Sequence, residues 1–262
     1  MPEVVASELV LHRGGREALA ASTFTIPNGV ITAVIGPNGS GKSTLLHAIA
    51  GLLEPTAGSI HVDGCDPEDV RERISYVLQS TQVNDAIPVT VREAVLMARF
   101  SGTGWLGRLS SDDRAVVSRA LERLDLTSIS GRHLRELSGG QRQRAFVAQG
   151  LAQDHDLLLL DEPLTGLDAP SAQVIDDVVH EEQASGHSVI LTTHDLAEAA
   201  AADHVVLVGG RVIASGPPDE VLTERNLAEA YGNGHHHGGP GPFLDDPAHL
   251  TEERHSHRSF EG

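Results

Sequence analysis

The sequence predicts an α/β fold: a mostly parallel sheet with helices on both faces, an antiparallel β part at the N-terminus and an inserted helical subdomain. Short β-branched apolar runs alternate with amphipathic stretches before residue 80 and again after residue 137. Between these positions the strand signals vanish and helical patterns take over. A parallel sheet of this kind binds its ligands at the carboxyl ends of its strands.

These changes of pattern divide the chain into four parts. Residues 1–79 and 138–231 are expected to form the two parts of one core, and residues 80–137 the helical subdomain. Residues 232–262 are rich in glycine, proline, histidine and acidic residues without periodicity, which is typical of a flexible tail.

In the first core part, the apolar run 30–35 between two glycines predicts a strand, and residues 42–50 predict a helix. A second unit is expected to consist of a strand over 59–62, a helix near 67–73 and a strand over 74–78. The pattern therefore places a glycine-rich loop between the first strand and the first helix.

Two amphipathic stretches, 91–100 and 112–124, predict the helices of the inserted part. Thr90 followed by Glu93 has the spacing of a capping box, which independently indicates that a helix begins there.

The second core part returns to alternation. Strands are predicted over 156–160 and 188–192, and helices over 168–179 and from His194 onward.

Composition narrows the functional classes. Of the 262 residues, 40% are hydrophobic, which is enough for a large core. A formal net charge of -18 repels phosphate backbones and disfavours nucleic acid as a partner. A single cysteine excludes an intramolecular disulfide and favours a reducing compartment. The chain has neither a signal-peptide pattern nor an apolar run of about 20 residues, so a membrane role would require another, membrane-spanning subunit.

The loop from Gly36 to Ser43 matches the phosphate-binding pattern G-x-x-x-x-G-K-S between a predicted strand and a predicted helix. Its backbone amides would surround phosphates at a helix N-terminus, Lys42 would reach the terminal phosphates, and Ser43 would ligate Mg²⁺. An ordinary glycine turn would need neither the lysine nor the hydroxyl. The candidate nucleotide ligands are Gly36, Pro37, Asn38, Gly39, Ser40, Gly41, Lys42, Ser43 and Thr44.

Two adjacent carboxylates follow the apolar strand that ends at Leu160. Asp161 would support the magnesium shell, and Glu162 would act as the general base that polarises the attacking water. Carboxylates after a strand can also form a solvated turn, but the phosphate loop upstream favours the catalytic interpretation.

The segment 137–144, Leu-Ser-Gly-Gly-Gln-Arg-Gln-Arg, predicts a second anion-binding helix start. Ser138 and Gln141 have capping-box spacing, and Gly139 and Gly140 would allow close approach of a phosphate. A capping box alone does not require two consecutive glycines.

This segment resembles the LSGGQ signature of ABC-type ATPases, and further motifs of that family follow in order. Gln79 stands where the Q-loop glutamine is expected, residues 164–168 resemble the D-loop and His194 resembles the switch histidine. The resemblance covers roughly residues 9–231. Asp168, the last D-loop residue, would also suit the N-cap of the next helix.

The resemblance implies a P-loop ATPase that uses ATP and Mg²⁺. It implies a head-to-tail homodimer in which Ser138, Gly139, Gly140 and Gln141 of one copy face the ATP held by Lys42 of the other. Glu162, His194 and Gln79 would take part in catalysis, with Gln79 also reaching the metal beside Ser43 and Asp161. The family further implies integral membrane permease subunits as partners and a position on the cytoplasmic face of the membrane.

The adenine contact departs from the family, which usually offers an aromatic ring before the first glycine pair. His12 and Arg13 precede Gly14 here, and Arg13 could stack its guanidinium on the base. His12 is the other candidate, and both residues could simply face solvent.

Residues 79–96 and 104–109 resemble the ATPases of zinc and manganese importers, which implies metal import with an extracytoplasmic metal-binding protein. Imidazoles and carboxylates in the tail are ligands that Zn²⁺ prefers, but this composition is more typical of a solvated acidic tail with incidental histidines. The alternatives are the ATPase of a split exporter, a soluble non-transport ABC ATPase, and a metal-binding regulatory module. The tail residues concerned are His235, His236, His237, Asp245, Asp246, His249, Glu252, Glu253, His255 and His257.

Overall fold

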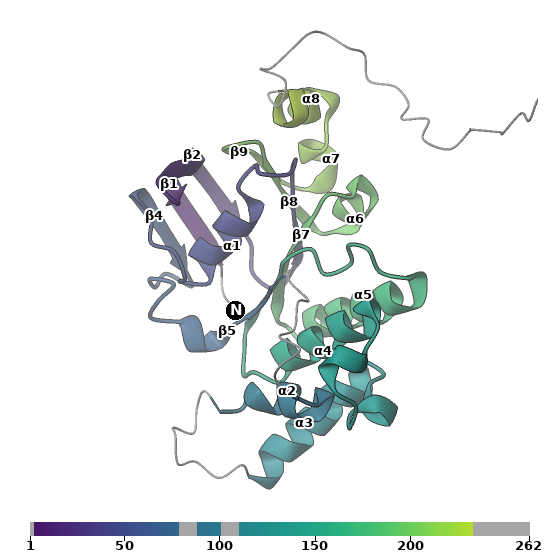
Figure 1. Ribbon diagram of the computed structural model, residues 1–262. Coiled ribbons are helices and arrows are strands. Elements are labelled where there is room, and N and C mark those ends of the chain that lie inside the picture. Colours follow the sequence, from purple (N-terminus) through teal and green to yellow (C-terminus); the bar gives the residue numbers. More distant parts are fainter. Residues whose placement is uncertain (1–2, 79–87, 101–109, 233–262) are drawn as a thin grey trace, which may run out of the picture.

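A computed structural model describes residues 3–78, 88–100 and 110–232. It contains one six-stranded and one three-stranded sheet, and most of the helices lie on the side of the six-stranded sheet that faces away from the three-stranded one (Figure 1). Gln79, most of the segments that resemble metal importers, and the tail beyond Gly232 lie outside the described residues.

The six-stranded sheet confirms the predicted mostly parallel core. Its order is β5-β6-β7-β3-β8-β9, and only β9 runs antiparallel to its neighbour. Alternate side chains of its central strands enter two separate cores, as the two-residue period of a strand requires. The strands are β3 (Ile31–Ile35), β5 (Ile74–Val77), β6 (Leu157–Leu160), β7 (Ser188–Thr193), β8 (His204–Val208) and β9 (Val212–Gly216).

The three-stranded sheet is antiparallel, in the order β2-β1-β4. Together with α1 (Lys42–Ile49), it covers one face of the large sheet (Figure 1). Its strands are β1 (Val4–Arg13), β2 (Arg16–Ile26) and β4 (Ala57–Val62).

The prediction of a helix near residues 67–73 is wrong, because this stretch contains only a 3₁₀ turn, Arg71–Arg73. Between 66 and 73 only Pro67 is fully buried, so the segment lacks the apolar stripe that packs a helix against a core.

The opposite face of the large sheet is covered by helices that come mainly from the middle of the chain. The predicted capping box is confirmed: Glu93 N donates to Thr90 Oγ1 at 3.3 Å, and Thr90 N donates to Glu93 Oε2 at 2.8 Å. The helices are α2 (Val91–Met97), α3 (Ser111–Arg123), α4 (Gly139–Leu151), α5 (Ala169–Ala184), α6 (Leu196–Ala201), α7 (Pro218–Val221) and α8 (Glu224–Gly232), with 3₁₀ turns at Thr127–Ile129 and Leu134–Glu136.

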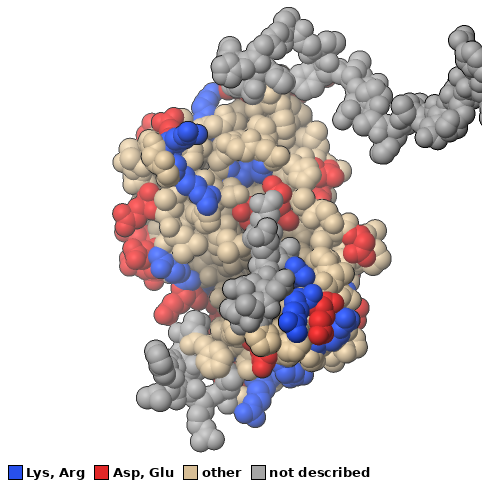
Figure 2. Space-filling model, viewed as in Figure 1, with Lys and Arg blue, Asp and Glu red and all other residues tan. Residues whose placement is uncertain are grey.

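Within the described ranges, no helix combines the length and apolarity needed to cross a bilayer. Arg side chains gather beside α4 on the face shown in Figure 2, whereas Asp and Glu dominate the edge formed by the three-stranded sheet. The carboxyl ends of β3, β6 and β7 meet at one edge of the large sheet, because these strands are parallel neighbours.

Candidate nucleotide-binding and hydrolytic site

The loop between β3 and α1 has a backbone that only glycine can form at two positions. A Cβ on Gly36 would lie 1.9 Å from the carbonyl oxygen of Val208, and one on Gly41 would lie 2.5 Å from that of Ala18. Gly41 also has a φ of +107°, which an L side chain rarely adopts. The loop is therefore held tightly against its neighbours, with its amides at the start of α1.

Lys42 lies inside this loop. Its Nζ donates hydrogen bonds to the carbonyl oxygens of Gly36 at 2.8 Å and Pro37 at 3.2 Å. Burial lowers the pKa of the Lys42 ammonium, while the carboxylates of Glu162 and Asp161 act in the opposite direction. The cation is thus confined to the place where the sequence pattern predicts terminal phosphates.

Asp161 connects the loop to the sheet. It follows β6, is only 4% exposed, and accepts bonds from three hydroxyls: Ser43 Oγ at 3.1 Å, Thr192 Oγ1 at 2.6 Å and Tyr76 Oη at 3.3 Å. Burial, reinforced by Asp161, raises the pKa of the Tyr76 phenol, so the phenol keeps its proton. A buried carboxylate beside a serine hydroxyl is a donor set that suits Mg²⁺.

Glu162 follows immediately, on a left-handed backbone with a φ of +49°. Its N–H donates to Thr192 Oγ1 at 2.8 Å, and Thr165 Oγ1 donates to its Oε2 at 3.3 Å. Thr192 therefore orients both carboxylate residues, through the Asp161 side chain and the Glu162 backbone. The structure brings Lys42, Ser43, Asp161 and Glu162 together, as the sequence predicts.

Sequence reasoning missed Thr192 and Tyr76 as site residues. Both lie on strands adjacent to β6, Thr192 at the end of β7 and Tyr76 near the end of β5. The available signal was a polar residue close to the carboxyl end of an otherwise apolar strand, but its partner depends on strand order.

The signature segment begins α4. Gln141 N donates to Ser138 Oγ at 3.2 Å, and Ser138 N donates to Gln141 Oε1 at 3.1 Å, which confirms the capping box. A Cβ on Gly140 would lie 2.4 Å from Ser171 Oγ and 2.8 Å from Asp168 Oδ1. Asp168 occupies the N-cap position of α5, but its side chain makes no capping hydrogen bond. The signature and the D-loop residue are therefore neighbours.

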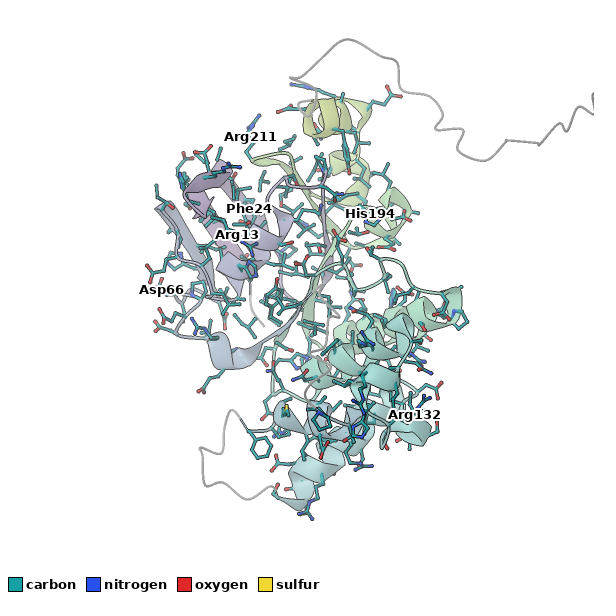
Figure 3. All side chains as sticks on the ribbon, viewed as in Figure 1. Arg13, Phe24, Asp66, Arg132, His194 and Arg211 are labelled. Atoms are coloured by element: carbon teal, nitrogen blue, oxygen red, sulfur yellow. The ribbon has the colours of Figure 1, made fainter. Side chains whose placement is uncertain are left out.

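Arg13, at the end of β1, is exposed and close enough to α1 to lower the pKa of His47, after the larger effect of burial (Figure 3). His194 is exposed in the turn between β7 and α6. The α1 and α4 helices cover opposite faces of the large sheet, so the phosphate loop and the signature lie on different sides of it (Figure 1).

Comparison with known proteins agrees with this geometry. Residues 19–165 match the family described as "ABC transporter". The chain is 38% identical to the manganese transport system ATP-binding protein MntA of Synechocystis, over 85% of this chain and 87% of that protein. It is 41% identical to the zinc transport system ATP-binding protein TroB of Treponema pallidum, over 87% and 86% respectively.

A solved structure with a similar fold is described as a metal-chelate type ABC transporter in an inward-facing conformation. The TM-score is 0.76 at 28% sequence identity, covering 88% of this chain and 89% of that one.

Replacement of Thr192 by Val should uncouple the two carboxylates. The buried Asp161 oxygen and the Glu162 amide each lose a partner, so we expect the free energy of unfolding to fall by about 1–3 kcal/mol. Loss of a group that orients metal-site ligands typically costs about 10–100-fold, and we expect kcat for ATP hydrolysis to fall by that factor. Chemical denaturation and phosphate release measure the two effects.

Thr32 provides the control. It lies on neighbouring β3, and within the described part of the chain its buried hydroxyl has no hydrogen-bond partner. Thr32→Val should therefore leave both quantities nearly unchanged. Equal kcat values for the two variants would contradict the role given to Thr192.

Proposed function

The chain belongs to the ABC transporter family, and from this membership and the site geometry we propose that it is the ATPase subunit of a divalent-metal importer. The metal would be zinc or manganese, carried through separate membrane subunits. The observation that best supports ATPase activity is a chain of hydrogen bonds at the end of the phosphate loop. Ser43 donates to Asp161, and Thr192 links Asp161 to the backbone of Glu162. The metal class is supported by the manganese and zinc transport relatives.

In this proposal, the loop amides and Lys42 bind the β- and γ-phosphates of ATP. Ser43, Asp161 and Gln79 would hold Mg²⁺, which would supply charge neutralisation on those phosphates. Glu162 accepts the proton of the attacking water, and His194 orients the γ-phosphate from the end of β7. The remaining ligands proposed are Gly36, Pro37, Asn38, Gly39, Ser40, Gly41 and Thr44.

Two copies would enclose two ATP molecules head to tail. The start of α4, with Ser138, Gly139, Gly140 and Gln141, would meet the γ-phosphate held by the other copy, and Asp168 would lie beside it. The basic side chains that gather beside α4 favour an anion at this end of the molecule (Figure 2). Hydrolysis would remove the shared charge and open the dimer.

The membrane subunits would dock at an open cavity of about 1140 Å³. Leu52 and Leu78, both about half exposed, line it together with Ala98 and Arg99 at the end of α2. Exposed apolar side chains around a groove are typical of a protein interface. Residues 80–137 would transmit motion from the core formed by residues 1–79 and 138–231, and the chain would lie on the cytoplasmic face of the membrane.

Two finer assignments complete the proposal. Arg13 would stack on adenine, since it is exposed at the end of β1 and close to α1. An extracytoplasmic metal-binding protein would deliver the ion. On the cytoplasmic side of the membrane, the histidines of residues 232–262 would bind Zn²⁺.

Arg13→Ala should weaken ADP binding by about 2- to 30-fold, because a cation over an aromatic ring contributes about 0.5–2 kcal/mol. Pyrophosphate, which lacks the base, should bind almost as before, and calorimetry with both ligands measures the difference. His12→Ala is the matched control, because the His12 ring is already hydrogen-bonded to Thr56 Oγ1 at 3.1 Å. Equal weakening for both ligands would show that Arg13 acts only through its charge.

Glu162→Gln should form a stable dimer with magnesium-ATP, since loss of the base prevents the hydrolysis that opens it. Light scattering with and without magnesium-ATP measures the mass. Lys42→Ala should stay monomeric because it cannot hold the phosphates. If Glu162→Gln binds ATP but remains monomeric, the assignment of the 138–141 signature fails.

Metal import is tested by accumulation of radioactive zinc and manganese in cells that contain the chain and its membrane subunits. Glu162→Gln should slow hydrolysis roughly 100-fold or more and reduce accumulation to the level of cells lacking the chain. Leu52→Glu should also abolish accumulation, while the purified chain keeps its ATPase rate. Normal accumulation of both metals with Glu162→Gln would refute the importer proposal.

A further inference from the structure

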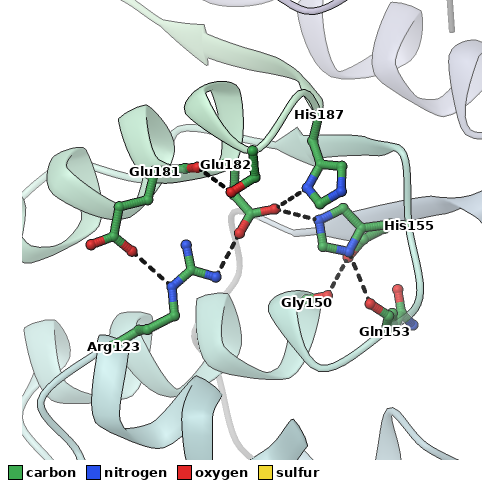
Figure 4. A network of polar contacts seen from close by, with 9 residues as sticks. Arg123, Gly150, Gln153, His155, Glu181, Glu182 and His187 are labelled. Atoms are coloured by element: carbon green, nitrogen blue, oxygen red, sulfur yellow. Dashed lines mark hydrogen bonds and ion pairs between the residues drawn. The ribbon is translucent and has the colours of Figure 1, made fainter. Parts of the chain in front are cut away.

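A second cluster of ionisable side chains lies away from the nucleotide site. His155 precedes β6, His187 precedes β7, and Glu182 lies near the end of α5 (Figure 4). Glu182 Oε2 is 3.0 Å from His155 Nε2 and 2.6 Å from His187 Nδ1. Two imidazoles therefore converge on one carboxylate oxygen. The ATPase chemistry derived above uses none of these residues.

The three groups have the chemistry and spacing of a transition-metal site. Two imidazole nitrogens and one carboxylate are a ligand set found at zinc sites, with bonds of about 2.0–2.2 Å and tetrahedral geometry. Ligand atoms in such a tetrahedron lie about 3.3 Å apart. Here all three candidate atoms lie within 4.8 Å of one another, so small side-chain rotations would suffice to bind an ion.

The surrounding contacts orient these groups as ligands. His155 Nδ1 lies 2.9 Å from the carbonyl oxygen of Gln153. A proton held on Nδ1 by that carbonyl directs Nε2 towards the ion, an arrangement common among metal-binding histidines. Arg123 Nη1 donates to the other oxygen, Glu182 Oε1, at 2.6 Å and leaves Oε2 to the imidazoles.

The charge state suits a cation as well. Burial acts against ionisation of Glu182, but hydrogen bonds from His155, Arg123 and His187 hold the pKa of its carboxyl at about 2. Glu182 is therefore an anion at neutral pH. A bound metal would replace the protons that now lie between the imidazoles and this carboxylate.

The cluster is also reachable. His155 and Glu182 side chains are 5% and 4% exposed, whereas His187 is 34% exposed, and all three line the cavity of about 1140 Å³ described above. A fourth coordination position would face that cavity and could hold water. An ion can thus enter without unfolding the chain.

We propose that His155, Glu182 and His187 form a binding site for one divalent transition-metal ion, at the end of the large sheet opposite to the ATP site. The site goes beyond the proposed import function, because none of its three ligands is among the residues assigned above to ATP hydrolysis. The competing interpretation is a purely structural ion-pair network between Arg123, Glu182 and the two histidines.

Zinc titration of the full-length chain by calorimetry decides between them. The six tail histidines must first be replaced by Asn, since they would bind the same ion: His235, His236, His237, His249, His255 and His257. This parent chain should bind one Zn²⁺ per chain, and His187→Ala, at the exposed ligand, should weaken binding at least tenfold. The difference between the natural chain and this parent measures the tail separately.

His180→Ala is the matched control, because His180 lies on α5, the helix that carries Glu182, but contacts Asp176 instead of the cluster. It should bind zinc as the parent does. Glu182→Gln, which keeps the shape but removes the charge, should lose affinity like His187→Ala, and circular dichroism verifies that each variant is folded. Absence of stoichiometric binding by the parent, or equal affinities for the parent and the His187 variant, would overturn the proposal.

Discussion

The carboxylate of Asp161 is where the phosphate loop, β5, β6 and β7 are joined. It is almost fully buried and accepts hydrogen bonds from hydroxyls that belong to three other elements. A carboxyl group at this depth is tolerated only when its oxygens are hydrogen-bonded, so the surrounding hydroxyls are required by folding as well as by chemistry. The position of Ser43 and the orientation of Glu162 through Thr192 both follow from this arrangement.

The local sequence pattern was sufficient to predict the structure where a motif and its flanking elements are contiguous in the chain. The strand, loop and helix around residues 30–50, the caps at Thr90 and Ser138, and the carboxylates after β6 were all predictable because their partners are a few residues away. The helix near residues 67–73 failed because charge and a proline imitate a helix start without an apolar face to bury. Contacts such as that of Thr192 with Asp161, 31 residues apart, depend on strand order, which periodicity does not reveal.

The two ends of the large sheet carry different chemistry. Asp161 and Thr192 lie at the carboxyl ends of β6 and β7, and His155 and His187 lie one or two residues before the amino ends of these strands. The same two strands therefore connect the hydrolytic groups with the His–Glu cluster through a few buried residues. Arg123, from α3, contacts Glu182 and ties the helical middle of the chain to that end of the sheet.

The left-handed backbone of Glu162 means that catalysis and folding favour different residues at this position. A non-glycine residue in this conformation costs of order 1–3 kcal/mol, which the bonds from its amide to Thr192 and from Thr165 to its carboxylate must offset. Glycine or asparagine would relieve that strain and abolish the base. A substitution at this position that removes the base would therefore raise the free energy of unfolding. A duplicated copy of this chain that accumulates such a substitution would lose hydrolysis and become more stable.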